Sequence, residues 1–241
     1  MLRVKESDKE MYLLHAQMPG FRRKVQQSIE IIQEFLRISR NPYIAWSTGK
    51  DSTCCVGLVR QVANVPAVHL DNGVELPGTA ETREKMDNVI HHIAEAPFLD
   101  LMEQYGFEAR ELRKENFVRA FEQKYDFDGV ILGLRAEESR ARILNAKNGP
   151  IYKKKDGIYV CCPILYWSVR DVFAYLLSNE LPIHPHYLLD SAQPLEERRV
   201  GGFISSRNRG AEMGRFVWLR QQYPNVFQML AERFPEIKKY V

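Results

Sequence analysis

The six residues 47–52 have the composition of a phosphate-binding loop. They follow an apolar run that predicts a buried strand, and they open a segment with helical spacing of apolar residues. A small turn at a helix N-terminus offers unpaired amides and the positive end of the helix dipole, and both favour anions. Short hydroxyl side chains and one lysine add further donors. The sequence therefore predicts a phosphate site formed by Ser47, Thr48, Gly49, Lys50, Asp51 and Ser52.

Two common phosphate loops are excluded by the positions of the glycines. A Walker A loop requires a glycine five residues before Gly49, where this chain has Ile44. A dinucleotide fingerprint requires three spaced glycines, and this segment has only Gly49. Asp51 does not favour phosphate by itself, so we expect it to hold the loop through backbone amides or to help place Mg²⁺. The alternative interpretation is an ordinary strand-to-helix turn.

A second group of charged residues follows the apolar run 129–134, which predicts a strand. Gly133 has no side chain to keep a nucleotide away from its backbone. Arg135 comes next, at the carboxyl edge of the sheet, where open α/β folds bind ligands. Arg142 lies a helical turn or two further on, and Glu138 is placed to orient either guanidinium. We expect the two arginines to bind phosphate, whereas the alternative is a solvated helix whose charges pair with one another.

The four cysteines form two adjacent pairs, Cys54–Cys55 and Cys161–Cys162. Neither pair has the C-x-x-C spacing of a zinc or thioredoxin-like site. We expect reduced and mostly buried thiols. The alternative is an iron–sulfur cluster held by both pairs, which requires them to meet at a roomy site.

Strands alternate with helices between residues 21 and 177. This order predicts an α/β fold, with a doubly wound and mostly parallel sheet that has helices on both faces. An Asp156–Gly157 turn predicts a hairpin over 152–159, and Ser168 is placed to cap a helix that ends at Leu177. The other predicted helices are 21–36, 54–62, 79–93, 117–123 and 136–145, and the predicted strands are 43–46, 65–70, 107–112 and 129–134.

The composition changes beyond Leu181, where prolines become frequent and arginines cluster. We therefore expect a nucleotide-binding α/β domain over 1–190 and a basic helical appendage of the same domain over 191–241, with helices at 212–222 and 226–234. Between residues 198 and 220 the only acid is Glu212. Such a segment is suited to a polyanion or a second phosphate, bound here by Arg207, Arg209 and Arg215. The alternative is a surface whose arginines pair with acids elsewhere.

The bulk composition is ordinary for a globular protein, and it limits the function only broadly. The net charge is +3 over 241 residues, which is too small to imply nucleic-acid binding by itself. No apolar run approaches the roughly 18 residues that span a bilayer. The first ten residues carry mixed charges and do not have the pattern of a signal peptide. We expect a cytoplasmic protein with no membrane partner, and the sequence leaves a homo-oligomer open.

Ser-x-Gly-Lys-Asp-Ser after a strand resembles the PP-loop of the adenine nucleotide α-hydrolase-like (HUP) superfamily. Three later segments, 68–73, 133–142 and 163–187, are similar in the same order to the branch of phosphoadenosine-phosphosulfate reductases and ATP sulfurylase small subunits. The resemblance covers about residues 41–187. It implies that Asp71 lies near the adenosine. It also implies that the nucleotide is bound by the PP-loop together with Gly133, Arg135, Glu138 and Ser139.

One part of the family pattern is missing. Thioredoxin-dependent sulfonucleotide reductases carry a nucleophilic cysteine in a Glu-Cys-Gly-x-His tail, whereas here no cysteine follows Cys162. The Cys-x-x-Cys of the reductases that hold a cluster is also absent. Sulfite-releasing chemistry therefore lacks its nucleophile in this chain.

The resemblance implies an ATP pyrophosphatase, which cleaves ATP between its α and β phosphates and adenylylates a substrate before sulfur is inserted. The PP-loop would hold the leaving pyrophosphate, with Mg²⁺ bridging phosphate oxygens. The expected catalytic residues are Lys50 and Asp51 of the loop, with Arg135 and Arg142 neutralising charge near the α-phosphorus.

The lost cysteine, the small size and the basic tail together resemble the PP-loop component of DNA phosphorothioation systems. This resemblance implies that the acceptor is a DNA backbone phosphate and that the partners include a cysteine desulfurase and other sulfur-modification proteins. One alternative is a sulfate adenylyltransferase small subunit or a reductase-like enzyme. A further alternative, from another class, is a module that senses ATP without consuming it.

Overall fold

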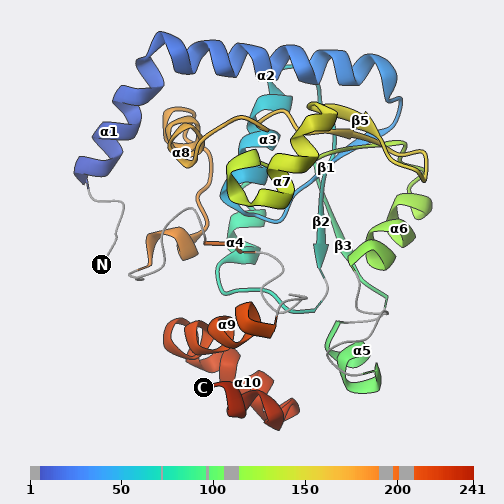
Figure 1. Cartoon of the computed structure of the whole chain (residues 1–241), viewed down its shortest axis with the longest axis vertical. Coiled ribbons are helices and arrows are strands. Elements are labelled where there is room, and N and C mark those ends of the chain that lie inside the picture. The colour runs from blue at the N-terminus through green and yellow to red at the C-terminus, as the bar shows by residue number, and fades with distance from the viewer. Residues whose placement is uncertain (1–5, 72, 96–97, 106–113, 190–197, 201–208) are drawn as a thin grey trace.

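The computed structural model describes residues 6–71, 73–95, 98–105, 114–189, 198–200 and 209–241. In these residues six strands form one sheet in the order β3-β2-β1-β4-β6-β5 (Figure 1). Neighbouring strands are parallel except for β5, which pairs antiparallel with β6. The predicted mostly parallel α/β sheet is therefore confirmed. The strands are β1 (Pro42–Ala45), β2 (Ala67–Asp71), β3 (Val89–Ile93), β4 (Gly129–Ile131), β5 (Ile151–Lys153) and β6 (Tyr159–Cys161).

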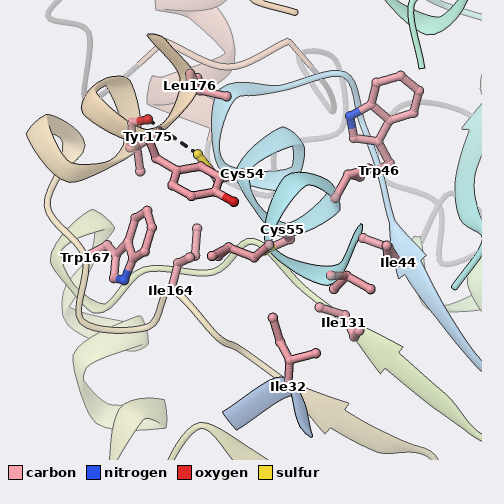
Figure 2. Close-up of a cluster of buried hydrophobic side chains, with 14 of the residues drawn as sticks. Ile32, Ile44, Trp46, Cys54, Cys55, Ile131, Ile164, Trp167, Tyr175 and Leu176 are labelled. Carbon is pink, nitrogen blue, oxygen red and sulfur yellow. Dashed lines mark hydrogen bonds between the residues drawn. The ribbon is translucent and has the colours of Figure 1, made fainter. Parts of the chain in front are cut away.

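Helices cover both faces of this sheet. Successive side chains of a strand point to opposite faces, so Ile44 packs into one buried cluster and its neighbour Tyr43 into another. The first cluster includes residues of the helices α1, α2, α3 and α8, and Figure 2 shows its centre. The second cluster includes Phe121 of α6. The helix bounds are α1 (Glu6–Gln17), α2 (Pro19–Ile38), α3 (Lys50–Arg60), α6 (Lys114–Lys124) and α8 (Val169–Ser178).

The order of the strands reverses beside β1. From β1 the chain moves outward through β2 to β3, and it then returns to place β4 on the other side of β1. In open α/β sheets, ligands bind outside the carboxyl ends of the strands at such a switch point. The segments that follow β1 and β4 are the two that the sequence analysis singled out for phosphate binding.

The C-terminal helices pack on a cluster of their own. Leu219 and Leu230 are buried against Phe98 and Met102, which belong to α5 (Phe98–Tyr105). Figure 1 shows α9 and α10 at the bottom of the view and α2 at the top. The two predicted C-terminal helices are confirmed as α9 (Arg209–Gln222) and α10 (Pro224–Arg233), followed by the short 3₁₀ helix η5 (Pro235–Tyr240).

Two predicted helices are wrong in part. The predicted helix 79–93 is the short α4 (Thr79–Arg83) followed by strand β3. The helix ends at Arg83, the positive φ of 50° at Asn88 is incompatible with a helix that continues to residue 93, and the residues that follow Asn88 pair with β2. The predicted helix 136–145 is divided at Ser139, which is extended and whose hydroxyl caps the second part. Its two parts are η2 (Ala136–Glu138) and α7 (Arg140–Asn145).

The remaining elements were predicted more closely. Ser168 caps α8 and shares a capping box with Asp171, as its position suggested. The hairpin is formed by β5 and β6, with Gly157 at a φ of 98° in its turn.

The predicted strand 107–112 lies outside the described residues, and α1 was not predicted. The short elements η3 (Ala146–Asn148) and η4 (Pro185–Leu188) complete the described chain. Among the described helices, none combines the length and apolar character needed to cross a bilayer.

Candidate active site

The predicted phosphate loop connects the carboxyl end of β1 to the first turn of α3. Gly49 is the N-cap residue of α3, which begins at Lys50. Inside the loop, Ser52 Oγ accepts from the Ser47 amide at 3.2 Å and donates to the Gly49 carbonyl at 3.0 Å. Thr48 takes the left-handed conformation, with a φ of 58°. The result is a hydrogen-bonded turn followed by the first amides of a helix, which have no acceptor within the helix.

Gly133 is required by the loop itself. A Cβ atom at this position would lie 2.6 Å from the Asp51 carbonyl carbon and 2.6 Å from the Ser52 amide nitrogen. Because these are backbone atoms, any side chain at residue 133 would push the loop away from β4. Gly133 also lines the cavity beside the loop, and the approach of a nucleotide to its backbone stays a prediction.

Asp51 is the centre of a buried charge cluster behind the loop. Its two carboxylate oxygens accept from Lys50 Nζ at 2.9 Å and from Arg135 Nε at 2.6 Å. Burial alone would raise the pKa of Asp51, but the two cations hold this pKa below its ordinary value. Asp51 was expected to hold the loop through backbone amides or to help place Mg²⁺, and its side chain ties the loop to the segment after β4.

Lys50 and Arg135 are fully buried and do not line the cavity beside the loop in the described chain. Lys50 Nζ also donates to the Arg198 carbonyl at 3.3 Å and lies over the Tyr187 ring. Arg135 also donates to Glu137 and to the Trp167 carbonyl, and its buried Nη2 has no hydrogen-bond partner among the described residues. Burial lowers the pKa of Lys50 despite the attraction of Asp51. Both cations thus support the loop from behind, and their direct contact with phosphate stays a prediction.

A cavity of about 500 Å³ lies in front of the loop, at the carboxyl ends of β1, β2 and β4. Its size is in the range of small-molecule sites. One part of the wall is polar and contains the loop residues Ser47, Gly49, Asp51 and Ser52. Another part is apolar and is lined by Val68, Leu70, Phe98, Val118, Phe121, Leu132 and Leu134.

Two arginines share one buried carboxylate at the wall of this cavity. The side chain of Glu138 is 1% exposed, and it binds both Arg142 and Arg199. The distance from Arg199 Nη1 to Glu138 Oε1 is 2.7 Å, and Glu138 Oε2 also accepts from the Arg135 amide at 3.3 Å. All three side chains line the cavity. Burial, together with repulsion from Arg199 and Arg135, lowers the pKa of Arg142 to about 10. Two guanidiniums against one carboxylate leave positive charge for an anion.

Other predicted site residues are engaged outside the cavity wall. The Asp71 carboxylate accepts from the Gly73 amide at 2.8 Å and contacts His91 Nε2 at 3.0 Å. Ser139 caps α7 through the Arg142 amide. Neither residue lines the cavity in the described chain, and nor does Thr48. Arg207 lies outside the described residues, and so do the side chains of Arg209 and Arg215, whose backbones belong to α9.

The sequence analysis did not assign Arg199 or Tyr187 to the site. The Tyr187 hydroxyl accepts from the Lys50 amide at 3.2 Å, so it touches the first turn of α3. Arg198 is fully buried and donates to the Tyr187 carbonyl at 3.2 Å. The arginine cluster that begins at residue 198 was the available signal for Arg199. No local pattern indicated that it reaches Glu138, which is 61 residues away in sequence.

All four cysteines are buried free thiols. Burial raises the pKa of each thiol, which disfavours the thiolate that a metal ion or cluster requires. Figure 2 shows Cys54 and Cys55 among apolar side chains, and Cys54 Sγ contacts the Val172 carbonyl at 3.4 Å. Cys161 belongs to the same cluster, whereas Cys162 belongs to the cluster on the other face of the sheet. In the part of the chain that the structure describes, the cysteines form no group able to share a metal ion.

Comparisons with known proteins show the family to which the chain belongs. Residues 41–208 match the model of the phosphoadenosine phosphosulfate reductase domain. Sulfate adenylyltransferase subunit 2 from Ectopseudomonas mendocina is 27% identical over 206 residues, which cover 70% of this chain and 67% of that protein.

Two solved structures share the fold. The phosphoadenylyl-sulfate reductase from Candida auris, in its phosphate complex, has a TM-score of 0.51 and 16% identity, over 66% of this chain and 82% of that chain. The FMN adenylyltransferase from Candida glabrata, in complex with FMN and an ATP analogue, has a TM-score of 0.54 and 15% identity, over 83% of both chains. Because the domain model matches most of the sequence, the chain belongs to the phosphoadenosine phosphosulfate reductase domain family, a family of enzymes within the PP-loop superfamily.

Proposed function

We propose that this protein cleaves ATP between its α and β phosphates and transfers the adenylyl group to an oxyanion acceptor. The observation that carries the proposal is the composition of the cavity wall. It joins the PP-loop to the pair Arg142 and Arg199, and it continues into an apolar part. ATP needs the same arrangement, because its phosphates require amides and cations and its adenine base requires an apolar surface.

The polar part of the cavity suits the transition state of adenylyl transfer. An acceptor oxygen attacks the α-phosphorus, the bond to the bridging oxygen of the β-phosphate breaks, and pyrophosphate leaves. Amides at the start of α3 would hold the leaving pyrophosphate, and the guanidiniums of Arg142 and Arg199 would neutralise charge on the reacting groups. Catalysis by positioning and electrostatics requires no side-chain nucleophile. The absence of a cysteine after Cys162 is compatible with this reaction.

Mg²⁺ fits this site chiefly through phosphate oxygens. Of the side chains in the loop, Asp51 has the oxygen ligands that Mg²⁺ prefers. Both of its oxygens are already bonded to cations, Lys50 and Arg135. The ion would reduce the charge repulsion between the phosphates, while Asp51 keeps the loop in place.

The apolar part of the cavity suits the adenine base. Val68 and Leu70 come from β2, and Leu132 and Leu134 follow β4, so the walls belong to the strands on either side of β1. The sequence-based prediction that Asp71 lies near the adenosine remains compatible with this placement, because Leu70 precedes it at the wall.

Two oxyanions are candidates for the acceptor. Sulfate is favoured by the curated relatives, which are named sulfate adenylyltransferase subunit 2. A DNA backbone phosphate, with a cysteine desulfurase as sulfur donor, is the hypothesis from the basic tail. It depends on Arg207, Arg209 and Arg215, whose side chains lie outside the described residues. Arg142 and Arg199 suit either acceptor, because a guanidinium binds sulfate and phosphate oxygens alike.

The reaction is tested with Mg-ATP labelled on the α-phosphate. We expect labelled AMP or an adenylylated acceptor, together with pyrophosphate. Arg142→Ala is expected to lower the rate about 100-fold, in line with the loss of one charge-stabilising donor. Arg140→Ala is the matched control, because Arg140 is exposed on the same helix, and its rate should be unchanged. Labelled ADP as the product would contradict the proposal, and so would ATP binding without turnover under all acceptor conditions.

The acceptor is identified by adding sulfate or a short DNA duplex to the same assay. Formation of adenylyl sulfate identifies sulfate, whereas label that is transferred to the duplex identifies the DNA phosphate. Adding a cysteine desulfurase with cysteine then shows whether sulfur enters the duplex. Tight ATP binding with neither product would instead support the nucleotide-sensing alternative.

A further inference from the structure

We propose that Asp71, Glu75 and His91 form a binding site for a divalent transition-metal ion at the edge of the nucleotide cavity. One ligand atom of each residue lies within 4.8 Å of the other two. Metal–ligand bonds of roughly 2.0–2.2 Å place neighbouring ligand atoms about 3–4 Å apart. Among the described residues, Asp71, Glu75 and His91 are the histidine, cysteine or acidic side chains that bring three ligand atoms this close together.

Two paired strands hold the site. β2 and β3 are parallel, with His69 opposite His91 and Asp71 opposite Ile93. Since alternate residues of a strand share a face, Asp71 and His91 project from the same face of the sheet, and His69 does so too. The imidazoles of His69 and His91 are 5.9 Å apart, between ring centroids. Ligands placed by strands keep their spacing better than ligands on loops.

The groups around the site orient its ligands. His69 Nδ1 lies 3.0 Å from the Trp46 carbonyl, which can only accept, so this nitrogen carries a proton. His69 Nε2 contacts Glu75, and Arg83 Nη1 lies 3.2 Å from Glu75 Oε1. Asp71 Oδ1 accepts from the Gly73 amide, which leaves Oδ2 directed at His91. Carboxylates and histidines that are held in this way by further hydrogen bonds are typical of metal sites.

The charge and ligand types indicate the class of ion. Glu75 pairs with the guanidinium of Arg83, and Asp71 pairs with the imidazole of His91. One imidazole with two carboxylates suits Mn²⁺, Fe²⁺, Co²⁺ or Zn²⁺ better than Mg²⁺ or Ca²⁺, which prefer oxygen ligands alone.

The ion would lie beside the nucleotide and apart from the phosphates. Glu75 and His69 line the cavity together with Leu70, whereas the PP-loop and Arg142 form the polar part of its wall. This site is therefore separate from the Mg²⁺ that would bridge the phosphates. An ion bound here would tie the segment that carries Glu75 to the ends of β2 and β3.

The site is tested with untagged protein that has been treated with a chelator, in the absence of nucleotide. Zn²⁺ is titrated by calorimetry, and Co²⁺ is titrated by its visible absorption. We expect saturation at one ion per chain, and His91→Ala should weaken binding at least about 10- to 100-fold. His91 is partly exposed, so the variant should fold. Its far-ultraviolet circular dichroism without metal provides the check, and Glu75→Gln provides a second variant.

His92→Ala is the matched control. His92 lies on the same strand but on the opposite face, where its ring packs beside Phe121 and Tyr125. This variant should bind the ion as the wild type does. Absence of saturable binding by the wild type would overturn the proposal, and so would equal binding by the wild type and both site variants. Because no nucleotide is used, neither outcome bears on the proposed reaction with ATP.

Discussion

At the scale of single residues, the loop is supported by two cations, Lys50 and Arg135, that do not line the cavity in the described chain. Asp51 is paired with Lys50 and Arg135, and both cations are fully buried. Removing one partner of a buried charge cluster leaves the others uncompensated, which is more costly than losing a surface pair. We infer that substitutions of these residues act on the position of the loop as well as on any contact with phosphate.

Gly133→Ala tests the position of the loop most directly. The added methyl group would meet backbone atoms of Asp51 and Ser52 at 2.6 Å, so the loop must shift. A displacement of about 1 Å at a reacting centre lowers rates about 100-fold, and we expect that loss in pyrophosphate release. The free energy of unfolding should fall by about 1–3 kcal/mol, as for other overpacked positions.

Gly20→Ala is the control for this substitution. Gly20 lies in α2, and nothing stands within 4 Å of an added Cβ there. Alanine is the better helix former by roughly 1 kcal/mol. This variant should therefore keep its rate and be equally or more stable in urea unfolding. A Gly133→Ala protein with wild-type pyrophosphate release would show that the loop tolerates the shift.

At the scale of elements, Asp171 joins three helices. Its carboxylate completes the capping box of α8 by accepting from the Ser168 amide at 2.7 Å. It also binds His15 of α1 at 2.8 Å and Lys24 of α2 at 2.6 Å. Burial alone would raise the pKa of Asp171, but the hydrogen bonds from Lys24, His15 and Ser168 lower it to about 2.

Asp171→Asn tests this junction through pH. A carboxyl whose pKa is lowered on folding contributes stability above its unfolded value of 3.8, and this contribution is lost as the pH falls toward 2. At pH 7 the variant should be less stable by about 2 kcal/mol, and the difference from the wild type should shrink between pH 4 and pH 2. Urea unfolding at several pH values measures both. A difference that is independent of pH would exclude the ionised carboxylate as the cause.

At the scale of the whole molecule, the C-terminal helices are joined to the sheet by apolar packing and by two buried histidines. His184 of the segment before η4 contacts the Thr79 hydroxyl at 3.1 Å, at the start of α4. His186 contacts the hydroxyl of Tyr223, the N-cap of α10, at 3.2 Å, and its ring lies against Trp218 of α9. Both histidines are 1% exposed, so they are packing residues as well as hydrogen-bond partners.

Because these two histidines are buried, we predict that the free energy of unfolding falls in mild acid. Burial lowers the pKa of His184 to about 4 and that of His186 to about 3, from an ordinary value of 6.5. The unfolded chain therefore binds more protons than the folded chain below pH 6.5. The free energy of unfolding should fall by up to about 1.4 kcal/mol per pH unit for each histidine as the pH falls from 6.5 toward 4.

His186→Phe separates this effect from other titrations. Phenylalanine keeps a ring beside Trp218 but cannot take up a proton. The variant should lose the Tyr223 contact and some stability at pH 7, and the slope of stability against pH below 6.5 should be smaller than in the wild type. Urea unfolding at pH 7, 6 and 5 compares the two slopes. Equal slopes would show that His186 does not titrate on unfolding.

Much of the site could be predicted because its signals are local. The loop 47–52 was identified from residue types that stand next to one another, and the Ser168 cap from a residue immediately before an apolar helix. The segment 89–93 was assigned to a helix because its strand state depends on hydrogen bonds to β2, from which it is separated by α4. The extended conformation of Ser139 was likewise absent from the local pattern.

The order of residues was sufficient to specify the alternating α/β plan, the turn 47–52 at the start of a helix and the helices with a strong apolar period. These depend on backbone geometry and burial within a few turns of chain. Three other arrangements were established by the fold alone. Lys50 and Arg135 both contact Asp51, and Arg199 joins Arg142 in binding Glu138. His91 contacts Asp71. Apart from Lys50 and Asp51, which are neighbours in the sequence, each of those arrangements pairs charges from distant segments. Such charges come within a few ångströms only after the sheet has formed, and the removal of water then makes their interaction strong.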